Sequence, residues 1–109
     1  MEPVNLSVTK NELAQMTGRQ LARTIGLIDP DGCWLNNEHT PFHLNGTPWT
    51  AYTTRGRGKN RHTSYLHIYR PVKLRVVDPD GHDTGMRVDD YDHMRGKLSD
   101  PLETYDWVS

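Results

Sequence analysis

The strongest constraint on the fold is a period of two that runs from Thr63 to Val77. Small and aliphatic side chains occupy one parity of this stretch, and mostly aromatic and basic side chains occupy the other. The first set is Ser64, Leu66, Ile68, Val72, Leu74 and Val76, and the second is Tyr65, His67, Tyr69, Lys73 and Arg75. Such alternation is typical of a half-buried strand. Pro71 cannot donate to a strand ladder, so it marks an edge, a bulge or a break between two strands.

The first 28 residues carry helical signals. Thr9 and Glu12 fit a capping box, in which each side chain bonds to the backbone N–H of the other residue. The apolar residues that follow fall partly on helical spacing, and Gly18 interrupts them. This pattern predicts either one helix with a weak point near Thr17 and Gly18 or two short helices that meet there.

The stretch ELAQMTGRQLARTIGL, residues 12–27, resembles the core of a helix-turn-helix motif. In this resemblance Gln20 and Arg23 lie on the outer face of the second helix, where such motifs contact DNA. Arg19 and Thr24 stand where the motif usually has core residues. A plain amphipathic helix packed on a sheet explains the same sequence.

The following segment, residues 29–88, has the composition of a β-rich region. Residues 29–32 and 78–81 both read DPDG, with proline and glycine at the places that a type I turn favours. Neither copy continues with the ligand spacing of an EF-hand, so we interpret both as structural turns. Residues 36–48 contain Pro41 and an Asn-Gly pair, which indicate a loop or hairpin.

A chain of 109 residues is long enough for one modest core, and we expect residues 1–109 to form a single small domain. The expected fold is α+β: an N-terminal helix or short helix pair followed by a small antiparallel sheet of about four to five strands. The β-rich segment would include a basic hairpin loop at residues 55–62. The last strand would end near Val88, and residues 89–109 would form an acidic segment docked by Tyr105, Trp107 and Val108.

Charge is divided sharply along the chain, although the net charge is only −1. Residues 1–38 carry three basic and five acidic side chains, residues 39–77 seven and none, and residues 78–109 three and nine. The three balances are therefore −2, +7 and −6. This distribution predicts a two-sided electrostatic surface, or an acidic segment that folds back over the basic one.

The basic segment supplies the candidate binding surface. Its loop carries four permanent cations beside glycines, and the outward parity of the next strand pairs rings with cations. Aromatic rings stack on bases, and Arg and Lys neutralise phosphates. The predicted binding residues are Arg55, Arg57, Lys59, Arg61, Tyr65, His67, Tyr69, Lys73 and Arg75. The predicted partner is DNA or RNA, and an acidic protein surface would suit the same face.

A catalytic role is not expected. The segment DPDGCWL, residues 29–35, resembles the opening of small phage-type HNH endonucleases, with His62 as their later histidine. Such enzymes need a histidine with a nearby acid or asparagine, a second metal-ligating histidine and often cysteine pairs, and nothing after Arg70 supplies that arrangement. Cys33 is the only cysteine. We interpret it as a small buried residue beside core residues Trp34 and Leu35, and we expect no catalytic residue, metal or cofactor.

The sequence thus predicts a small non-enzymatic nucleic-acid-binding or regulatory protein, in the style of phage or mobile-element accessory proteins. The alternative is a protein-binding module, either a host-factor inhibitor or a self-assembling virion or assembly subunit, that uses complementary basic and acidic patches. In that case the chain would form a homo-oligomer. A single cysteine and the absence of an apolar run of ~20 residues predict a soluble intracellular protein with no membrane association. Its place would be the host cytoplasm, or the virion if a phage encodes it.

Overall fold

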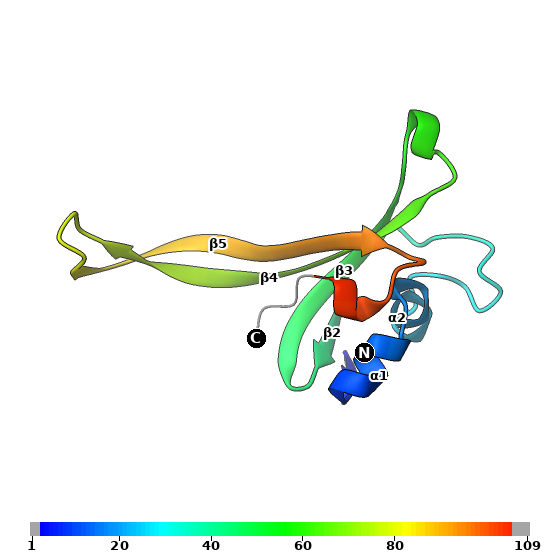
Figure 1. Ribbon diagram of the computed structural model, residues 1–109, viewed down its shortest axis with the longest axis horizontal. Helices are drawn as coiled ribbons and strands as arrows, with labels where there is room; N and C mark the ends of the chain where they lie inside the picture. Colours follow the sequence, from blue (N-terminus) through cyan, green and yellow to red (C-terminus); the bar gives the residue numbers. More distant parts are fainter. Residues whose placement is uncertain (1–2, 106–109) are drawn as a thin grey trace.

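The computed structural model describes residues 3–105 and has the expected α+β class (Figure 1). Two short helices precede most of a five-stranded sheet. In chain order the elements are β1 (Val4–Leu6), α1 (Lys10–Gln15), α2 (Gly18–Thr24), β2 (Thr40–Leu44), β3 (Thr47–Arg55), the 3-10 helix η1 (Gly58–Asn60), β4 (Ser64–Val77), β5 (Asp83–Lys97) and the 3-10 helix η2 (Leu102–Thr104).

The sheet has the strand order β1-β2-β3-β4-β5. Its first pair, β1 with β2, is parallel and the other three pairs are antiparallel. The sheet is therefore mixed, which corrects the expectation of a purely antiparallel one. Strand β1 is only three residues long, too short for its alternation to indicate a strand, and β2 contains Pro41, so the sequence signal for both strands was weak.

The predicted helix pair is confirmed, and two consecutive capping boxes explain the break between the helices. Thr9 and Glu12 cap α1 as expected, and Thr17 and Gln20 form a second box that starts α2. Both Met16 and Thr17 have an extended backbone, so Met16 ends α1 and Thr17 begins α2. Helix α2 packs against β4 of the sheet, whereas α1 packs against η2.

One face of the sheet and the helices form the core. Leu21, Ala22 and Ile25 of α2 belong to the same buried cluster as Leu66 and Ile68 of β4. The aliphatic parity of β4 therefore faces the helices along the first half of this strand, as the alternation predicted. The opposite face of the sheet is left without a covering layer of helix in the described residues.

Tyr105 fixes the segment that follows β5 to the body. Its side chain is buried, and its hydroxyl donates a hydrogen bond to the carbonyl oxygen of Lys97 at 2.7 Å. The ring lies against Gly96, and a Cβ atom at this glycine would come within 2.4 Å of it. The docking predicted for Tyr105 is thus confirmed, whereas Trp107 and Val108 lie outside the described residues.

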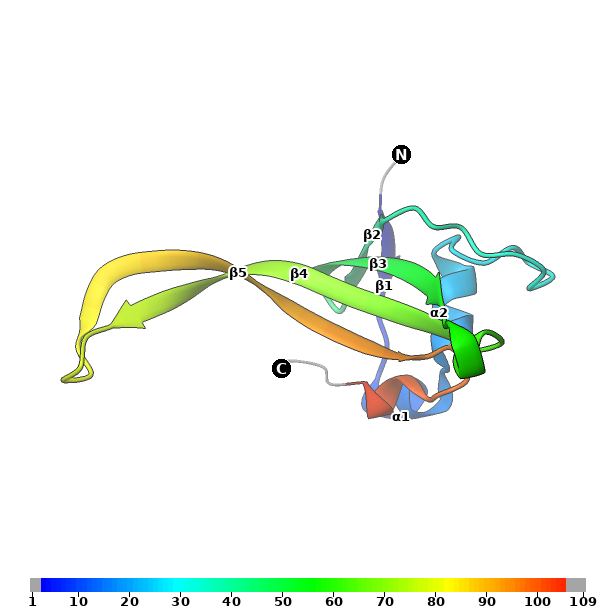
Figure 2. The ribbon, with the colours of Figure 1, turned by 90° about the horizontal axis from the view of Figure 1, so that it is seen from above.

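Strands β4 and β5 continue far beyond their neighbours and form a projecting hairpin (Figures 1 and 2). The pairing of β3 with β4 ends at Tyr69, so residues 70–92 are a two-stranded ribbon that we call the arm. The register of β4 with β5 is continuous across Pro71, and the shift occurs farther out, between Arg75 and Val77. Pro71 therefore does not break the strand.

Two further expectations need correction. The last strand does not end near Val88, because β5 extends to Lys97 and includes the acidic residues that we assigned to a docked tail. Trp34 is 56% exposed and Cys33 is also exposed, so neither is a core residue.

The two DPDG segments are turns as predicted, since the backbone N–H of the fourth residue of each donates to the carbonyl oxygen of the first at 2.9 Å.

Within residues 3–105, no helix has the length and apolar character needed to cross a membrane.

Candidate nucleic-acid interface

The open face of the sheet carries a group of aromatic and histidine side chains. Directly paired residues of neighbouring strands place their side chains on the same face. Tyr52 on β3 pairs with His67 on β4, and Tyr69 on β4 pairs with His93 on β5. The predicted residues Tyr65, His67 and Tyr69 therefore share this face with rings from two neighbouring strands.

The rings form a stacked row across the strands. His39, in the loop before β2, stacks on Tyr52 with ring centroids 4.4 Å apart, and Tyr52 stacks on His67 at 4.5 Å. Tyr69 contacts both Tyr52 and His39 edge-on, and its hydroxyl oxygen lies 2.8 Å from His39 Nδ1. His67 also contacts His93 at 5.5 Å. Because ring faces within the row cover one another, free ring surface remains mainly at its exposed ends.

His67 occupies the centre of the row and is only 9% exposed. Its Nε2 atom lies 2.8 Å from the hydroxyl of Thr54, and Nδ1 has no hydrogen-bond partner among the described residues. Burial, the neighbouring His93 and the charge of Arg95 together lower the pKa of His67 from 6.5 to about 4. His67 is therefore neutral at pH 7 and supports the row from within, which corrects its expected place on an exposed surface.

The four predicted cations here are all exposed: Arg55 is the last residue of β3, and Arg57, Lys59 and Arg61 lie in the loop between β3 and β4. Backbone hydrogen bonds close this loop on itself. Gly56 N–H donates to the carbonyl of Thr63 at 2.8 Å, and η1 lies inside the loop. Within residues 3–105, none of the four cations forms an ion pair with a carboxylate.

Two further cations lie on the open face at the same end of the sheet. Strand β5 places Arg95 opposite His67 and Lys97 opposite Tyr65. The guanidinium of Arg95 lies over the Tyr65 ring, 5.0 Å from its centroid, and both cations are exposed. Neither forms an ion pair within the described part of the chain. The ring row is thus bordered by positive charge without neighbouring acids.

The structure separates the remaining two predicted residues from this cluster. Lys73 and Arg75 lie on the arm, which projects away from the loop between β3 and β4 (Figure 1). Lys73 pairs with Asp89 at 2.8 Å, and Arg75 pairs with Asp83 at 3.9 Å. The acidic segment therefore folds back over part of the basic one, as the charge distribution allowed. The cations of the arm are neutralised within the chain.

Sequence reasoning missed six of the residues that this face brings together. They are His39, Tyr52, Tyr91, His93, Arg95 and Lys97. The last four lie on β5, where a run of aspartates concealed the strand. A period-two reading of residues 91–97 would have placed Tyr91, His93, Arg95 and Lys97 on one face.

The endonuclease-like features do not come together. Cys33 and Trp34 border a shallow hollow with Arg55, whereas His62 lies in the loop and contacts Arg61.

At the tip of the arm, ligand atoms of Asp78, Asp80 and His82 lie within 4.8 Å of one another. One carboxylate oxygen of Asp78 accepts the backbone N–H groups of both other residues, which is the geometry of a structural turn.

Comparisons of the chain with protein-family models, with curated proteins and with solved structures find no significant match.

Proposed function

We propose that this protein binds single-stranded nucleic acid across the open face of its sheet. The observation that supports the proposal is the uneven neutralisation of charge. Every cation of the arm pairs with an aspartate, whereas the five described cations around the body end of the open face pair with none. These five are Arg57, Lys59, Arg61, Arg95 and Lys97, because the pairing of Arg55 with Ser64 places Arg55 on the other face.

The rings beside this charge suit single strands better than a duplex. Unstacked bases can use free aromatic surface, and this contribution depends little on sequence. Tyr91 is 62% exposed, and with His39 and His93 it lines a shallow hollow at the edge of the row. Stacking of bases is expected at these exposed rings, while the buried His67 fixes the spacing between its neighbours. Phosphates would follow Arg95, Lys97 and the loop.

Fluorescence anisotropy with labelled single strands of about 20 nucleotides tests this proposal. We expect binding in 50 mM salt that weakens steeply toward 200 mM, because each phosphate contact contributes about −0.7 to the slope of log K against log salt. Arg95→Ala with Lys97→Ala should reduce that slope by about 1.4 if both residues contact phosphates. Tyr91→Ala should weaken binding with little change in slope, because stacking releases no counterion.

Lys59→Glu and Lys10→Glu form a matched pair, since each exposed lysine lacks an ion pair in residues 3–105 and each change lowers the net charge by the same amount. Only Lys59→Glu should weaken binding, because Lys10 lies at the start of α1, outside the open face. If both variants weakened binding equally, binding would depend on the net charge of the protein and not on the position of the lysine. No binding to DNA or RNA strands in 50 mM salt would overturn the proposal.

The alternative of complementary basic and acidic patches between molecules has less support. The acids of β5 are the natural partners for such a basic surface, and three of them already pair with cations of the arm.

A further inference from the structure

The arm is amphipathic. On β4, Val72, Leu74 and Val76 share one face of the ribbon, and the register places Val88 opposite Leu74 and Asp90 opposite Val72. Met86 has the parity of Val88 and lies on the same side. We call Val72, Leu74, Val76, Met86 and Val88 the apolar face of the arm. Asp90 and the ion pair between Arg70 and Asp92 border it near the body.

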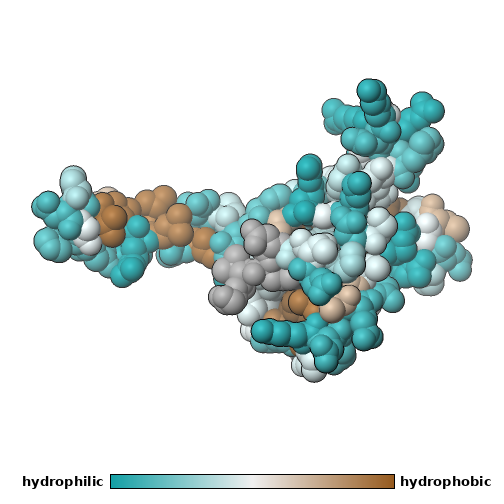
Figure 3. Space-filling view, in the orientation of Figure 1, coloured by the Kyte–Doolittle hydropathy of each residue, from teal (hydrophilic) through white to brown (hydrophobic). Residues whose placement is uncertain are grey.

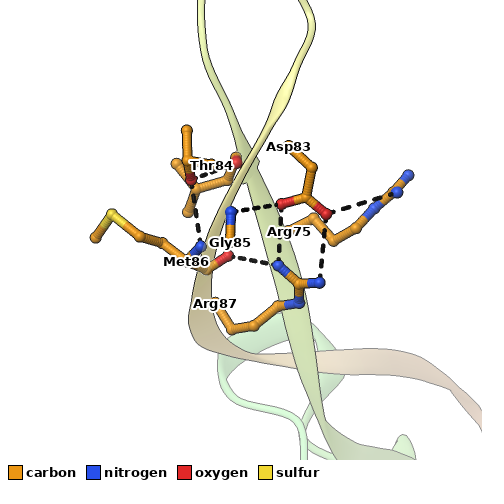
Figure 4. Close-up of polar contacts among 7 residues, drawn as sticks. Arg75, Asp83, Thr84, Gly85, Met86 and Arg87 are labelled. Atoms are coloured by element: carbon orange, nitrogen blue, oxygen red, sulfur yellow. Dashed lines mark hydrogen bonds and ion pairs between the residues drawn. The ribbon is translucent and has the colours of Figure 1, made fainter.

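The opposite face of the arm is polar and closed by its own charges. Lys73 pairs with Asp89, while Arg75 and Arg87 both contact the carboxylate of Asp83. Figure 4 shows these two arginines converging on Asp83, with the Met86 side chain directed to the other side of the ribbon. This face therefore needs no partner for its cations.

The apolar face is exposed to a degree that is unusual for a stable monomer. Leu74, Met86 and Val88 are 49%, 62% and 50% exposed. These are three of the seven exposed large hydrophobic residues in the described chain, and Figure 3 shows hydrophobic surface along the arm. A two-stranded ribbon is marginally stable in water, and contiguous exposed apolar surface of this kind marks an interaction site.

The chain exposes more surface than a compact monomer of the same mass would. The chain exposes 7715 Å², whereas a compact monomer of its mass, 12.5 kDa, is expected to expose about 6,200 Å². The difference of about 1,500 Å² comes from the extended shape as a whole, and it leaves room for the ~800 Å² that each partner buries in an interface of standard size. The radius of gyration is 16.3 Å, against about 13 Å for a compact domain of this length.

We infer that the occupant of the apolar face is the same face of a second copy, with the two arms antiparallel about a twofold axis. A partner must offer a flat apolar strip of the same width with few unpaired charges, and the second arm meets that requirement. The net charge of −1 gives little repulsion between copies. Two ribbons packed in this way form a small sandwich that buries apolar side chains of both copies.

The axis passes near the middle of the strip, where Leu74 pairs with Val88. A residue beside a twofold axis meets its own copy, so cysteine at this position becomes a specific probe. In a Cys33→Ser background, Leu74→Cys should form a disulfide-linked dimer under mild oxidation. Lys73→Cys, one residue away on the polar face, should stay monomeric under the same conditions.

Sedimentation equilibrium of the full chain gives the independent test. At about 100 µM the wild type should have twice the monomer mass of 12.5 kDa, because specific interfaces of standard size have dissociation constants of micromolar or below. Leu74→Glu should raise the dimer dissociation constant at least about 10-fold, since it places a charge at the axis. Lys73→Gln, on the polar face, should leave the mass unchanged.

Circular dichroism distinguishes a dissociated variant from an unfolded one, and Val88→Lys repeats the test if Leu74→Glu does not fold. A wild type that stays monomeric at 100 µM would overturn the inference and leave the apolar face to a different protein. So would a dimer that persists in both charge variants, or equal crosslinking of Leu74→Cys and Lys73→Cys. None of these results depends on nucleic acid, so this inference and the proposed function can fail separately.

Discussion

At the scale of single residues, His67 links the open face to the stability of the fold. Its ring is stacked on Tyr52, and its Nε2 atom contacts Thr54. Protonation would place a charge in a buried position beside Arg95, which is why the pKa is lowered to about 4. A histidine that must stay neutral makes the folded state sensitive to acid.

The consequence for stability follows from linkage. Between pH 6.5 and about 4 the unfolded chain binds a proton at His67 that the folded chain does not. The free energy of unfolding should therefore fall across this window as the pH decreases, by at most about 3 kcal/mol from His67. Urea denaturation at pH 7.5, 5.5 and 4.5 measures it.

His67→Phe keeps a ring in the row and removes the titrating group, so its stability should decline less than that of the wild type between pH 7.5 and 4.5. The carboxylates titrate in both proteins and cancel in the comparison. Identical pH dependence in the two proteins would show that His67 is protonated in the folded chain as readily as in the unfolded one.

At the scale of elements, the sequence predicted those strands and helices that leave a pattern among residues close together in the chain. The alternation in β4 and the Thr9 capping box predicted their elements because core packing and capping both leave a short-range pattern. The part of β5 after Val88 escaped because it begins on the arm, where no core requires apolar residues. Two aspartates, Asp90 and Asp92, occupy the parity that would otherwise be aliphatic.

The composition of the candidate site was also only partly predictable. Tyr65, His67 and Tyr69 were placed on one face because a strand fixes the direction of its own side chains. Their neighbours Tyr52 and His93 depend on strand register, which a single sequence does not determine for distant strands. The ion pair between Lys73 and Asp89 could not be predicted for the same reason, because it also depends on the register of two strands.

The contact between Gly96 of β5 and the ring of Tyr105 gives a prediction about the packing of elements. Gly96→Ala would place a Cβ atom 2.4 Å from the Tyr105 ring, so ring or strand must shift. We expect a loss of about 1–3 kcal/mol in the free energy of unfolding, which is typical of overpacking. Urea denaturation measures the loss, and Ser99→Ala at an exposed position nearby should have little effect.

A double-mutant cycle identifies the source of that loss. Tyr105→Ala alone is destabilising, because it removes a buried ring and its hydrogen bond to Lys97. In the Tyr105→Ala background, Gly96→Ala should cost far less than in the wild type, since the clashing ring is gone. Additive losses would indicate that Gly96 is needed for its own backbone and not for contact with the ring.

At the scale of the whole molecule, the two proposed surfaces lie at different ends. The basic loop between β3 and β4 and the tip of the arm point in different directions from the body (Figures 1 and 2). Antiparallel arms would place the tip of each arm beside the body of the other copy. The two open faces would then belong to one elongated dimer, and the arm would serve to present two binding surfaces together.

Such a dimer should bind long strands by avidity. Once one open face holds a strand, the second meets the same strand at a high effective concentration, provided that the strand spans both. At protein concentrations that maintain the dimer, a strand of about 60 nucleotides should bind at least about 10-fold more tightly than one of 12 nucleotides. Anisotropy with both strands at one salt concentration measures this ratio.

Leu74→Glu isolates the contribution of the arm to that ratio. This variant should bind the short strand like the wild type, because Leu74 lies outside the open face, and it should lose most of the gain on the long strand. A longer strand also offers more binding registers to a monomer, and the gain that remains in Leu74→Glu measures this statistical part. If the variant kept the full gain, the two surfaces would act independently, and the arm would not couple them.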